Sequence, residues 1–475
     1  MMELPCYALK NIVAKVGAIF WKHGRRLCFH KKYMARKEGS PMKKLLALVL
    51  VALMLMPMTA SLAATEFDVT EPITITWWHA HEDQLTEYLN YMVDKFNTEN
   101  EMGITVEPVY IGSYDEINTQ FIAAAAAGTG TVPALVTCNT SYPASYGKDG
   151  LCEVLDPYID AFDYDLEDFG EGLIASTSYE DEQICLPYLI STQVMYYNKT
   201  AAEEEGITMP KTFDEMDAFL EKATLFNEDG TTKRYGTVIG GWDYWYYEML
   251  YKNNGVETVT ADGTTDVNSE KSVEITTKIK EWIDKGYAYY AYGTDASTNM
   301  RQLFWDGGAF SVFHTSSLYD TYVTNVAASA NPFEVGMAWL PGGSDGESFK
   351  SEVGGAAILI PAAASQAEKN AAWQFLMFMT SPEINLYWAD KTGYFPTRAS
   401  VQGTPEYEEY LSRKPAMADI VAMSSWINPR NQNPAYDACA NLWRHALAQI
   451  FNEGAPIQET LDALAVEIQE TLDDQ

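Results

Sequence analysis

The residues best suited to chemistry in this chain are aromatic, and they gather at positions 240–248. Five of these nine residues are Trp or Tyr, and Asp243 lies among them. Aromatic faces stack on the C–H faces of sugar rings, while a neighbouring carboxylate accepts hydrogen bonds from sugar hydroxyls. The segment therefore predicts a sugar platform that includes Trp242 and Trp245. The alternative is a helix that buries its rings in the core, since Trp242, Trp245 and Tyr246 would share one helical face.

A second aromatic and polar group follows the first predicted strand, where residues 77–83 read Trp-Trp-His-Ala-His-Glu-Asp. Ligands of α/β domains bind outside the carboxyl ends of the strands, which is where we expect Trp78, His79 and Glu82. A metal site is disfavoured, because no further histidine lies nearby. The alternative role for Glu82 or Asp83 is that of an acidic residue in the first turn of a helix.

Patterns for catalysis and cofactor binding are poor. No P-loop occurs, and no glycine-rich dinucleotide fingerprint follows a strand. The chain contains 66 acidic residues, so some pair at glycosidase spacing arises by chance and supports no hydrolase assignment. We expect no catalytic residues, no cofactor and no bound metal ion.

A secretory signal begins at Met42. Two lysines precede an apolar run at 45–56, and small residues follow up to Ala64. About 12 apolar residues are too few to span a bilayer, which needs about 20. We expect residues 42–64 to be a cleaved signal peptide and the mature protein to lie in the periplasm or outside the cell. Residues 1–41 are then upstream sequence from a start assigned too early, or a long basic extension of the signal.

The rest of the chain is strongly acidic. From residue 65 onward it has 21 basic and 64 acidic residues, a net charge of −43. Such a field repels nucleic acid and anionic membranes. The 411 residues exceed one hydrophobic core and indicate two domains. No cysteine follows the signal for lipid attachment, so we expect a soluble monomer. Cys138 and Cys152 are either bridged or buried free thiols.

Hydrophobic periodicity predicts an α/β fold. A strand at 73–78, a helix at 84–97 and a strand at 104–110 form a βαβ unit. No low-complexity linker occurs, so the chain is expected to cross between its domains through ordered strands. Further predicted helices are 114–127, 213–222, 269–285, 366–379, 382–391, 435–451 and 456–472, and further apolar strands lie at 133–138, 185–197, 309–314 and 356–360.

Seven short motifs keep a characteristic order along the chain. They are Thr76-Trp-Trp-His79, Tyr110-Ile-Gly-Ser-Tyr-Asp-Glu116, residues 187–199, Gly241-Trp-x-x-Trp245, Trp305-Asp-Gly-Gly-Ala309, Gly354-Gly-Ala356 and Lys391-Thr-Gly-Tyr-Phe-Pro396. In these motifs the chain resembles the extracellular solute-binding proteins, family 1, which deliver carbohydrates and related solutes to ABC importers. The resemblance covers nearly all of the chain after the signal.

The resemblance implies an α/β fold of two lobes, the type II periplasmic-binding-protein fold, with a ligand cleft between the lobes and a helical C-terminal region. Lobe 1 would comprise residues 65–190 and 356–395, and lobe 2 residues 191–355 and 396–475. The lobes would close on the ligand about a hinge, and the closed form would dock on membrane permease subunits.

The resemblance also implies a set of ligand residues. Trp78 and His79 adjoin the first of the positions where the glycerol-3-phosphate-binding members hold their ligand. By position, those members' ligand residues fall on Glu82, Tyr114, Thr140, Ser191, Trp242, Trp245, Ser316, Gly355 and Tyr394.

Two departures from these members bear on the ligand. Their glutamate is Thr140 here, and their anion-binding arginine aligns near Ala440, with Arg444 one helical turn away. Phosphate in a closed cleft favours a bidentate arginine, so we expect a neutral mono- or oligosaccharide. Maltose-binding relatives offer an aromatic ring from this helix, where Asn441 stands here. The alternatives are a binding protein for glycerol-3-phosphate or a glycerophosphodiester, and a secreted glycan-active hydrolase.

Overall fold

The computed structural model describes residues 66–128, 130–421 and 427–474. The predicted signal peptide at 42–64 and the segment 1–41 lie outside these residues. Within the described ranges, no helix combines the length and the apolar character needed to cross a membrane.

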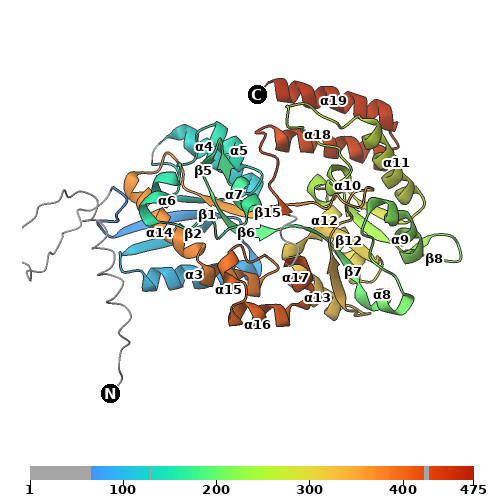
Figure 1. Cartoon of the computed structure of the whole chain (residues 1–475), viewed down its shortest axis with the longest axis horizontal. Helices are drawn as coiled ribbons and strands as arrows, with labels where there is room; N and C mark the ends of the chain where they lie inside the picture. Colours follow the sequence, from blue (N-terminus) through green and yellow to red (C-terminus); the bar gives the residue numbers. More distant parts are fainter. Residues whose placement is uncertain (1–65, 129, 422–426, 475) are drawn as a thin grey trace, which may run out of the picture. The chain divides into compact units, whose positions relative to one another are not determined.

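The first sheet has five strands in the order β2-β1-β3-β15-β6 (Figure 1). β1 (Ile73–His79) pairs in parallel with β2 (Ile104–Tyr110) and with β3 (Leu135–Asn139). β15 (Gly354–Leu359) runs antiparallel between β3 and β6 (Leu186–Ser191). β3 and β6 are apolar and buried almost throughout, which is typical of strands covered on both faces.

Helices cover both faces of this sheet. α3 (Asp83–Glu99), α14 (Gln366–Met379) and α15 (Pro382–Lys391) share one hydrophobic cluster with it, and α4 (Tyr114–Ala127) belongs to a second cluster. The βαβ alternation of the sequence therefore yields a layered α/β unit.

The second sheet also has five strands, in the order β11-β10-β12-β7-β13. β10 (Thr237–Gly240) is parallel to β11 (Ala288–Ala291) and β12 (Ser311–Thr315). β7 (Gln193–Asn198) runs antiparallel between β12 and β13 (Val335–Ala338). Each sheet thus consists of three parallel strands extended by one antiparallel strand and its partner.

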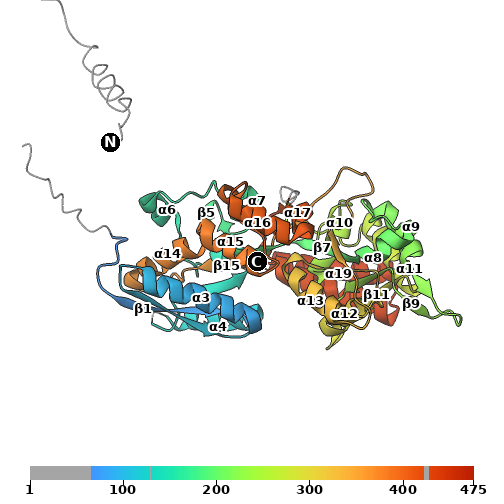
Figure 2. The ribbon, with the colours of Figure 1, turned by 90° about the horizontal axis from the view of Figure 1, so that it is seen from below.

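Most of the remaining helices pack around the second sheet, where Figure 2 shows α11, α12 and α13. They are α8 (Lys199–Glu205), α9 (Met216–Ala223), α10 (Met249–Lys252), α11 (Glu270–Asp284), α12 (Ala296–Trp305), α13 (Tyr319–Ala328), α16 (Pro405–Arg413), α17 (Pro415–Val421), α18 (Tyr436–Ala448) and α19 (Ile457–Asp473). The smaller elements are α5 (Pro143–Lys148), α6 (Asp156–Phe162), α7 (Glu171–Ala175) and the short strands β4 (Ser178–Tyr179), β5 (Glu182–Gln183), β8 (Leu225–Phe226), β9 (Thr232–Arg234), β14 (Ser351–Glu352) and β16 (Ile427–Asn428).

The chain passes between the two sheets through ordered segments, as the sequence predicts. Thr192 alone separates β6 from β7, and it is fully buried. Its N–H donates to Ser316 Oγ (3.1 Å), and the Ser316 N–H donates back to the Thr192 carbonyl (2.9 Å). Beside this crossing, β14 pairs in parallel with β16.

The predicted elements hold with small changes of boundary, except that the stretch 185–197 contains two strands of different sheets, β6 and β7. Two further expectations need comment. The segment 240–248 is not an α-helix, since a single 3₁₀ turn (Tyr244–Tyr246) precedes the short α10. Cys138 and Cys152 are free, buried thiols. The structure therefore has the second of the two alternatives that the sequence left open.

Candidate functional site

A cavity of about 250 Å³ lies where the two sheets meet, and we call it the inner cavity. Side chains from both sheets and from the segments between them form its walls. Its lining residues are Tyr114, Asn139, Ser191, Asp243, Trp245, Tyr246, Thr315, Ser317, Gly354, Gly355, Tyr394 and Arg430.

The strand topology explains this location. Asn139 and Thr315 are the last residues of the parallel strands β3 and β12, so both stand at carboxyl ends, where α/β folds bind ligands. Ser191 ends β6 and pairs with Gly354, the first residue of the antiparallel β15. Four strand ends from the two sheets therefore converge on one space.

Two glycines allow the close approach of these strands. Gly355 has φ +100°, and a Cβ there would lie 1.9 Å from the Leu189 carbonyl oxygen. A Cβ on Gly354 would lie 2.4 Å from the Trp245 ring. The ring of Trp245, which belongs to the second sheet's unit, therefore rests on the backbone of the first sheet.

Hydroxyl groups line one side of the inner cavity. Tyr114 is the first residue of α4, whose start is fixed by a capping box between Ser113 and Glu116. The Tyr114 hydroxyl is hydrogen-bonded to that of Tyr394, which also bonds to Ser317. Burial raises the pKa of both tyrosines, so these hydroxyls stay neutral and can serve as donors and acceptors.

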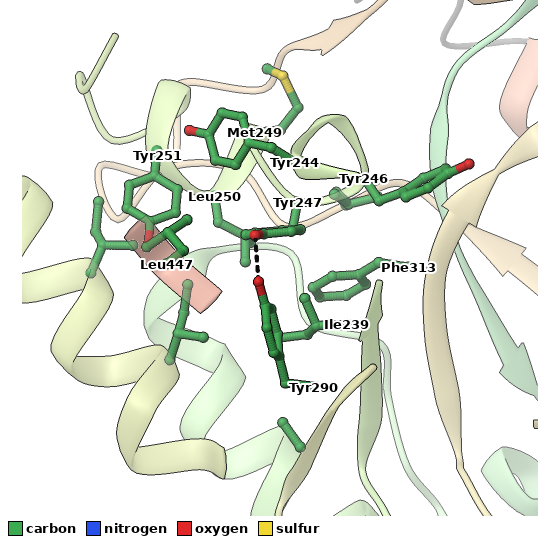
Figure 3. Close-up of a cluster of buried hydrophobic side chains, with 14 of the residues drawn as sticks. Ile239, Tyr244, Tyr246, Tyr247, Met249, Leu250, Tyr251, Tyr290, Phe313 and Leu447 are labelled. Atoms are coloured by element: carbon green, nitrogen blue, oxygen red, sulfur yellow. Dashed lines mark hydrogen bonds between the residues drawn. The ribbon is translucent and has the colours of Figure 1, made fainter. Parts of the chain in front are cut away.

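The aromatic segment divides between core and cavity. Tyr244, Tyr247 and Tyr251 are buried in the core of the second unit, and the Tyr247 and Tyr290 hydroxyls lie 3.2 Å apart (Figure 3). Trp245 and Tyr246 line the inner cavity instead. The rings therefore pack in the core, as the alternative expected, but from short turns and not from a continuous helix, while the sugar platform stays a prediction.

Asp243 contributes a carboxylate to the inner cavity. Its Oδ1 accepts the N–H of Trp245 (3.0 Å) and so caps the 3₁₀ turn. Burial raises the pKa of Asp243, and the charges of Arg430 and Arg444 oppose this shift. The carboxylate is thus held in place by a backbone bond, with acceptor capacity left for a ligand hydroxyl.

Arg430 lies at the edge of the cavity within a buried group of charges. Its Nη1 is 3.5 Å from Glu248 Oε1 and 3.6 Å from Glu352 Oε2. Lys252 Nζ contacts Glu352 and lies 3.7 Å from Glu248 Oε2. The guanidinium also lies over the Trp245 ring, 5.6 Å from its centroid. We call Glu248, Lys252, Glu352 and Arg430 the charge cluster.

The cluster compensates its charges internally. Burial and the nearby Glu352 raise the pKa of Glu248, while burial of Glu352 is outweighed by Lys252 and Arg430, which lower the pKa of its carboxyl. The Tyr436 hydroxyl also donates to Glu248. Glu352 therefore offsets part of the charge of Lys252 and Arg430, whereas Glu248, whose pKa is raised to about 8, is largely uncharged near neutral pH.

A larger cavity of about 1330 Å³ adjoins the inner one and shares Arg430 with it, and we call it the outer cavity. Its walls come from α7 and the turn after it, from residues 249–266, and from residues 428–434. Each cavity is lined by residues from both halves of the protein, so a ligand in either one could contact both.

The family of the chain follows from its sequence. A family profile described as "Bacterial extracellular solute-binding protein" matches residues 91–418, well over half of the chain. The chain belongs to this family. The predicted resemblance is thereby confirmed, together with its placement among extracellular proteins.

Named relatives of this solute-binding protein include two sn-glycerol-3-phosphate-binding periplasmic proteins. The one from Yersinia enterocolitica is 25% identical over 383 residues, which is 76% of this chain and 82% of that protein. The one from Escherichia coli K12 is 26% identical over 361 residues, 71% of this chain and 77% of that protein.

Solved structures share the fold. UgpB from Mycobacterium tuberculosis, in complex with glycerophosphocholine, superimposes with a TM-score of 0.72 at 22% identity, covering 85% of this chain and 99% of that one. The GacH receptor of Streptomyces glaucescens, solved unliganded and with acarbose, gives 0.69 at 22% identity, covering 84% and 98%. The predicted two-lobe α/β fold of solute-binding proteins is confirmed.

The structure brings together five of the thirteen predicted ligand residues of this solute-binding protein. They line the inner cavity and are Tyr114, Ser191, Trp245, Gly355 and Tyr394.

Others lie next to the cavity wall without lining it. Ser316 is fully buried and bonds to Thr192, while its neighbours Thr315 and Ser317 line the cavity. Thr140 is buried beside Asn139, and its N–H donates to the Gly355 carbonyl (3.2 Å). Trp242 packs against Tyr246, with ring centroids 4.8 Å apart.

The remaining predicted residues lie away from the lining. His79 is buried and stacks on His81 at 5.7 Å between ring centroids, and burial lowers its pKa to about 4. Trp78 packs in the cluster beneath α4, and Glu82 is exposed at the start of α3. On α18, Asn441 is exposed, and Arg444 Nη2 lies 3.1 Å from His445 Nε2.

Several lining residues were not predicted. Asp243 and Tyr246 stood within the aromatic segment, and Thr315 and Ser317 flank Ser316, so each had a local signal. Arg430 had none. It follows the two-residue strand β16 in a stretch without hydrophobic periodicity, and long-range pairing with β14 brings it to the site.

One Gly-x-Ser-x-Gly pattern does occur, at residues 342–346, and was not foreseen. Ser344 is exposed, and its Oγ donates to Asp214 Oδ1 (2.8 Å). It stands in a turn between β13 and β14, whereas a hydrolase nucleophile stands on a strand-to-helix turn. Among residues 66–128, 130–421 and 427–474, no group of three or more His, Cys, Asp or Glu side chains is placed to hold a metal ion.

Proposed function

We propose that this solute-binding protein captures a neutral sugar in the inner cavity and delivers it to the permease subunits of an ABC importer. The observation that carries the proposal is the meeting of Trp245 and Tyr246 with the fixed carboxylate of Asp243 in a cavity reached by both sheets. Rings of this kind stack on the C–H faces of a sugar, and the carboxylate accepts hydrogen bonds from the sugar hydroxyls.

The electrostatics of the cavity favour a neutral ligand over a phosphate. Arg430 is the cation of the lining, and the carboxyls of Glu248 and Glu352 lie within 3.6 Å of its Nη1. The carboxyls of Asp437 and Asp243 also interact electrostatically with Arg430. A phosphate would therefore meet the carboxylate of Glu352, which already compensates part of the charge of the guanidinium.

A second candidate is a ligand that contains a phosphate, such as glycerol-3-phosphate or a glycerophosphodiester. Arg430 in the lining favours it, because a planar guanidinium suits phosphate oxygens. The named relatives bind sn-glycerol-3-phosphate, which adds to this candidate.

Closure of the lobes would supply the transport signal. We propose lobe 1 as residues 65–190 and 356–395 and lobe 2 as the remainder, with Ser191 and Gly355 at the hinge. A ligand that touches Tyr114 on one side and Trp245 on the other stabilises the closed state, because only that state offers both contacts. The protein is proposed to act as a monomer without catalysis.

A binding comparison of wild type with Asp243→Asn tests the proposal. Calorimetric titration would use a panel of neutral sugars alongside sn-glycerol-3-phosphate and glycerophosphocholine. We expect the wild type to bind a neutral sugar, and Asp243→Asn to weaken that binding by roughly 1.5–3 kcal/mol, the usual worth of a hydrogen bond to a charged group.

Asp229→Asn is the matched control, since Asp229 is exposed in a turn distant from the cavity lining. Binding of phosphorylated compounds alone, strengthened by Asp243→Asn, would make the second candidate correct. Release of shortened products from a polysaccharide by the wild type would instead indicate the hydrolase.

A further inference from the structure

The outer cavity is too large to be explained as packing around the inner one. It has about 1330 Å³ against about 250 Å³, and the two share the buried side chain of Arg430. Ala175, at the end of α7, lines it on one side, and residues 257–266 line it on the other. The side chain of Arg430 therefore stands where the two cavities adjoin.

Buried polar atoms without partners stand at the junction. Among the described residues, Arg430 Nε and Gln432 Oε1 form no hydrogen bond, although the Arg430 side chain is only 10% exposed. The Gln432 amide nitrogen donates to the Arg430 carbonyl (2.8 Å), so its oxygen is the free end. Leaving a buried donor or acceptor unsatisfied costs about 1–3 kcal/mol, so such atoms call for a ligand or water.

The lining selects for neutral polar groups. Six of its residues are acidic and three are basic, so the lining has no excess of cations for an anionic ligand. Two of the three cations, Lys252 and Arg430, are paired within the charge cluster. One free donor and one free acceptor suit hydroxyl groups, which do both.

We propose that the outer cavity binds the further units of an oligosaccharide whose terminal unit occupies the inner cavity. This rests on the proposed function and adds the size of the ligand. Arg430 and Gln432 form the junction between the units, with Arg430 Nε donating to and Gln432 Oε1 accepting from sugar hydroxyls. The preferred ligand is then a di- or longer saccharide.

A pool experiment tests the length of the ligand. Partial hydrolysates of starch, xylan, galactan and mannan supply saccharides of one to about six units. The protein is incubated with the pool and separated by gel filtration, and the retained sugars are sized by mass spectrometry. We expect the wild type to retain saccharides of two or more units. In titrations the retained saccharide binds at least tenfold more tightly than its own monosaccharide.

Ala175→Trp should remove this gain, because the indole would occupy space in the outer cavity. Its affinity for the retained saccharide should fall to that of the monosaccharide, while binding of the monosaccharide is unchanged. Ala175→Ser is the matched control and should behave as wild type. Gln432→Ala provides a second, less bulky variant that lowers the affinity for the longer sugar only, and thermal melting checks that each variant is folded.

Two results would overturn the inference in distinguishable ways. Retention of monosaccharides alone, or equal affinity for all lengths in the wild type, leaves the sugar-binding function intact and refutes the role of the outer cavity. Retention of no sugar refutes the proposed function and the inference together.

Discussion

The inner cavity and the charge cluster adjoin each other, but their buried polar groups differ in how far they are paired within the protein. Arg430 belongs to both, while the other members of the charge cluster lie in the part of the chain proposed as lobe 2. In the cluster, carboxyls and cations pair with one another, and Arg430 Nε, which forms no hydrogen bond to any described residue, is its open end. In the cavity, Asp243 and the aromatic rings keep capacity for a partner. The comparison teaches that a buried polar group indicates a binding site only where its bonds remain incomplete.

The largest expected effect separates the two regions by stability. Lys252→Met would leave the buried Glu248 and Glu352 short of one cation, and breaking such a buried pair typically costs 3–5 kcal/mol. Urea unfolding measures the free energy. Lys285→Met is the control, since its pair with Glu281 is exposed and worth less than about 1 kcal/mol. A loss as small as the control's would mean that the cluster contributes no more to the free energy of unfolding than a surface ion pair does.

The next effect is on binding. Trp245→Ala removes the aromatic face of the inner cavity, and we expect sugar binding to weaken by roughly 1–3 kcal/mol. Trp245→Phe keeps a ring and should retain most of the affinity. Calorimetric titration of both variants gives the difference, and an unchanged affinity in Trp245→Ala would remove this ring from the site.

The smallest effect is a pH dependence of stability that arises from Asp437, which interacts with Arg430. Burial raises the pKa of Asp437 to about 6, with Arg430 and Ser141 opposing the shift. The folded state therefore binds this proton more tightly than the unfolded state, whose pKa is about 4, so stability falls as pH rises from about 4 through 6 and is lowest above that range.

Asp437→Asn removes that dependence. We expect roughly 1 kcal/mol more stability than wild type at pH 7, less than the full shift because the side chain keeps some exposure. The two proteins should differ least near pH 4. Melting curves between pH 4 and pH 8 measure the difference, and a difference that does not change with pH would assign it to packing.

Sequence reasoning succeeded where the signal was local. The strand and helix periodicity around β1, α3, β2 and α4 placed Tyr114 at the start of a helix that faces the cleft. Trp245 was found from the density of aromatic residues around it. In both cases the element that positions the side chain is made of the residue's own neighbours.

It failed where distant pairing decides position. Arg430 reaches the inner cavity only because β16 pairs with β14, and the Asn428 amide there donates to the Ser351 carbonyl 77 positions earlier. Asn441 and Arg444 were assigned to the site by analogy along α18. A helix of this length presents several faces, and neither residue lines the cavity. The alternative of a helix at 240–248 was likewise wrong, because Tyr244 and Trp245 lie in a short 3₁₀ turn.

The position of β15 has a consequence for the order of folding during synthesis. This strand lies between β3, which ends at Asn139, and β6, yet it begins only at Gly354, after the whole second sheet. The first sheet therefore stays incomplete until the ribosome has passed Leu359. Pairing across so long a stretch of chain slows assembly, because the loop must close before the contacts form. The N-terminal half therefore emerges with β3 and β6 lacking the strand that pairs with both of them.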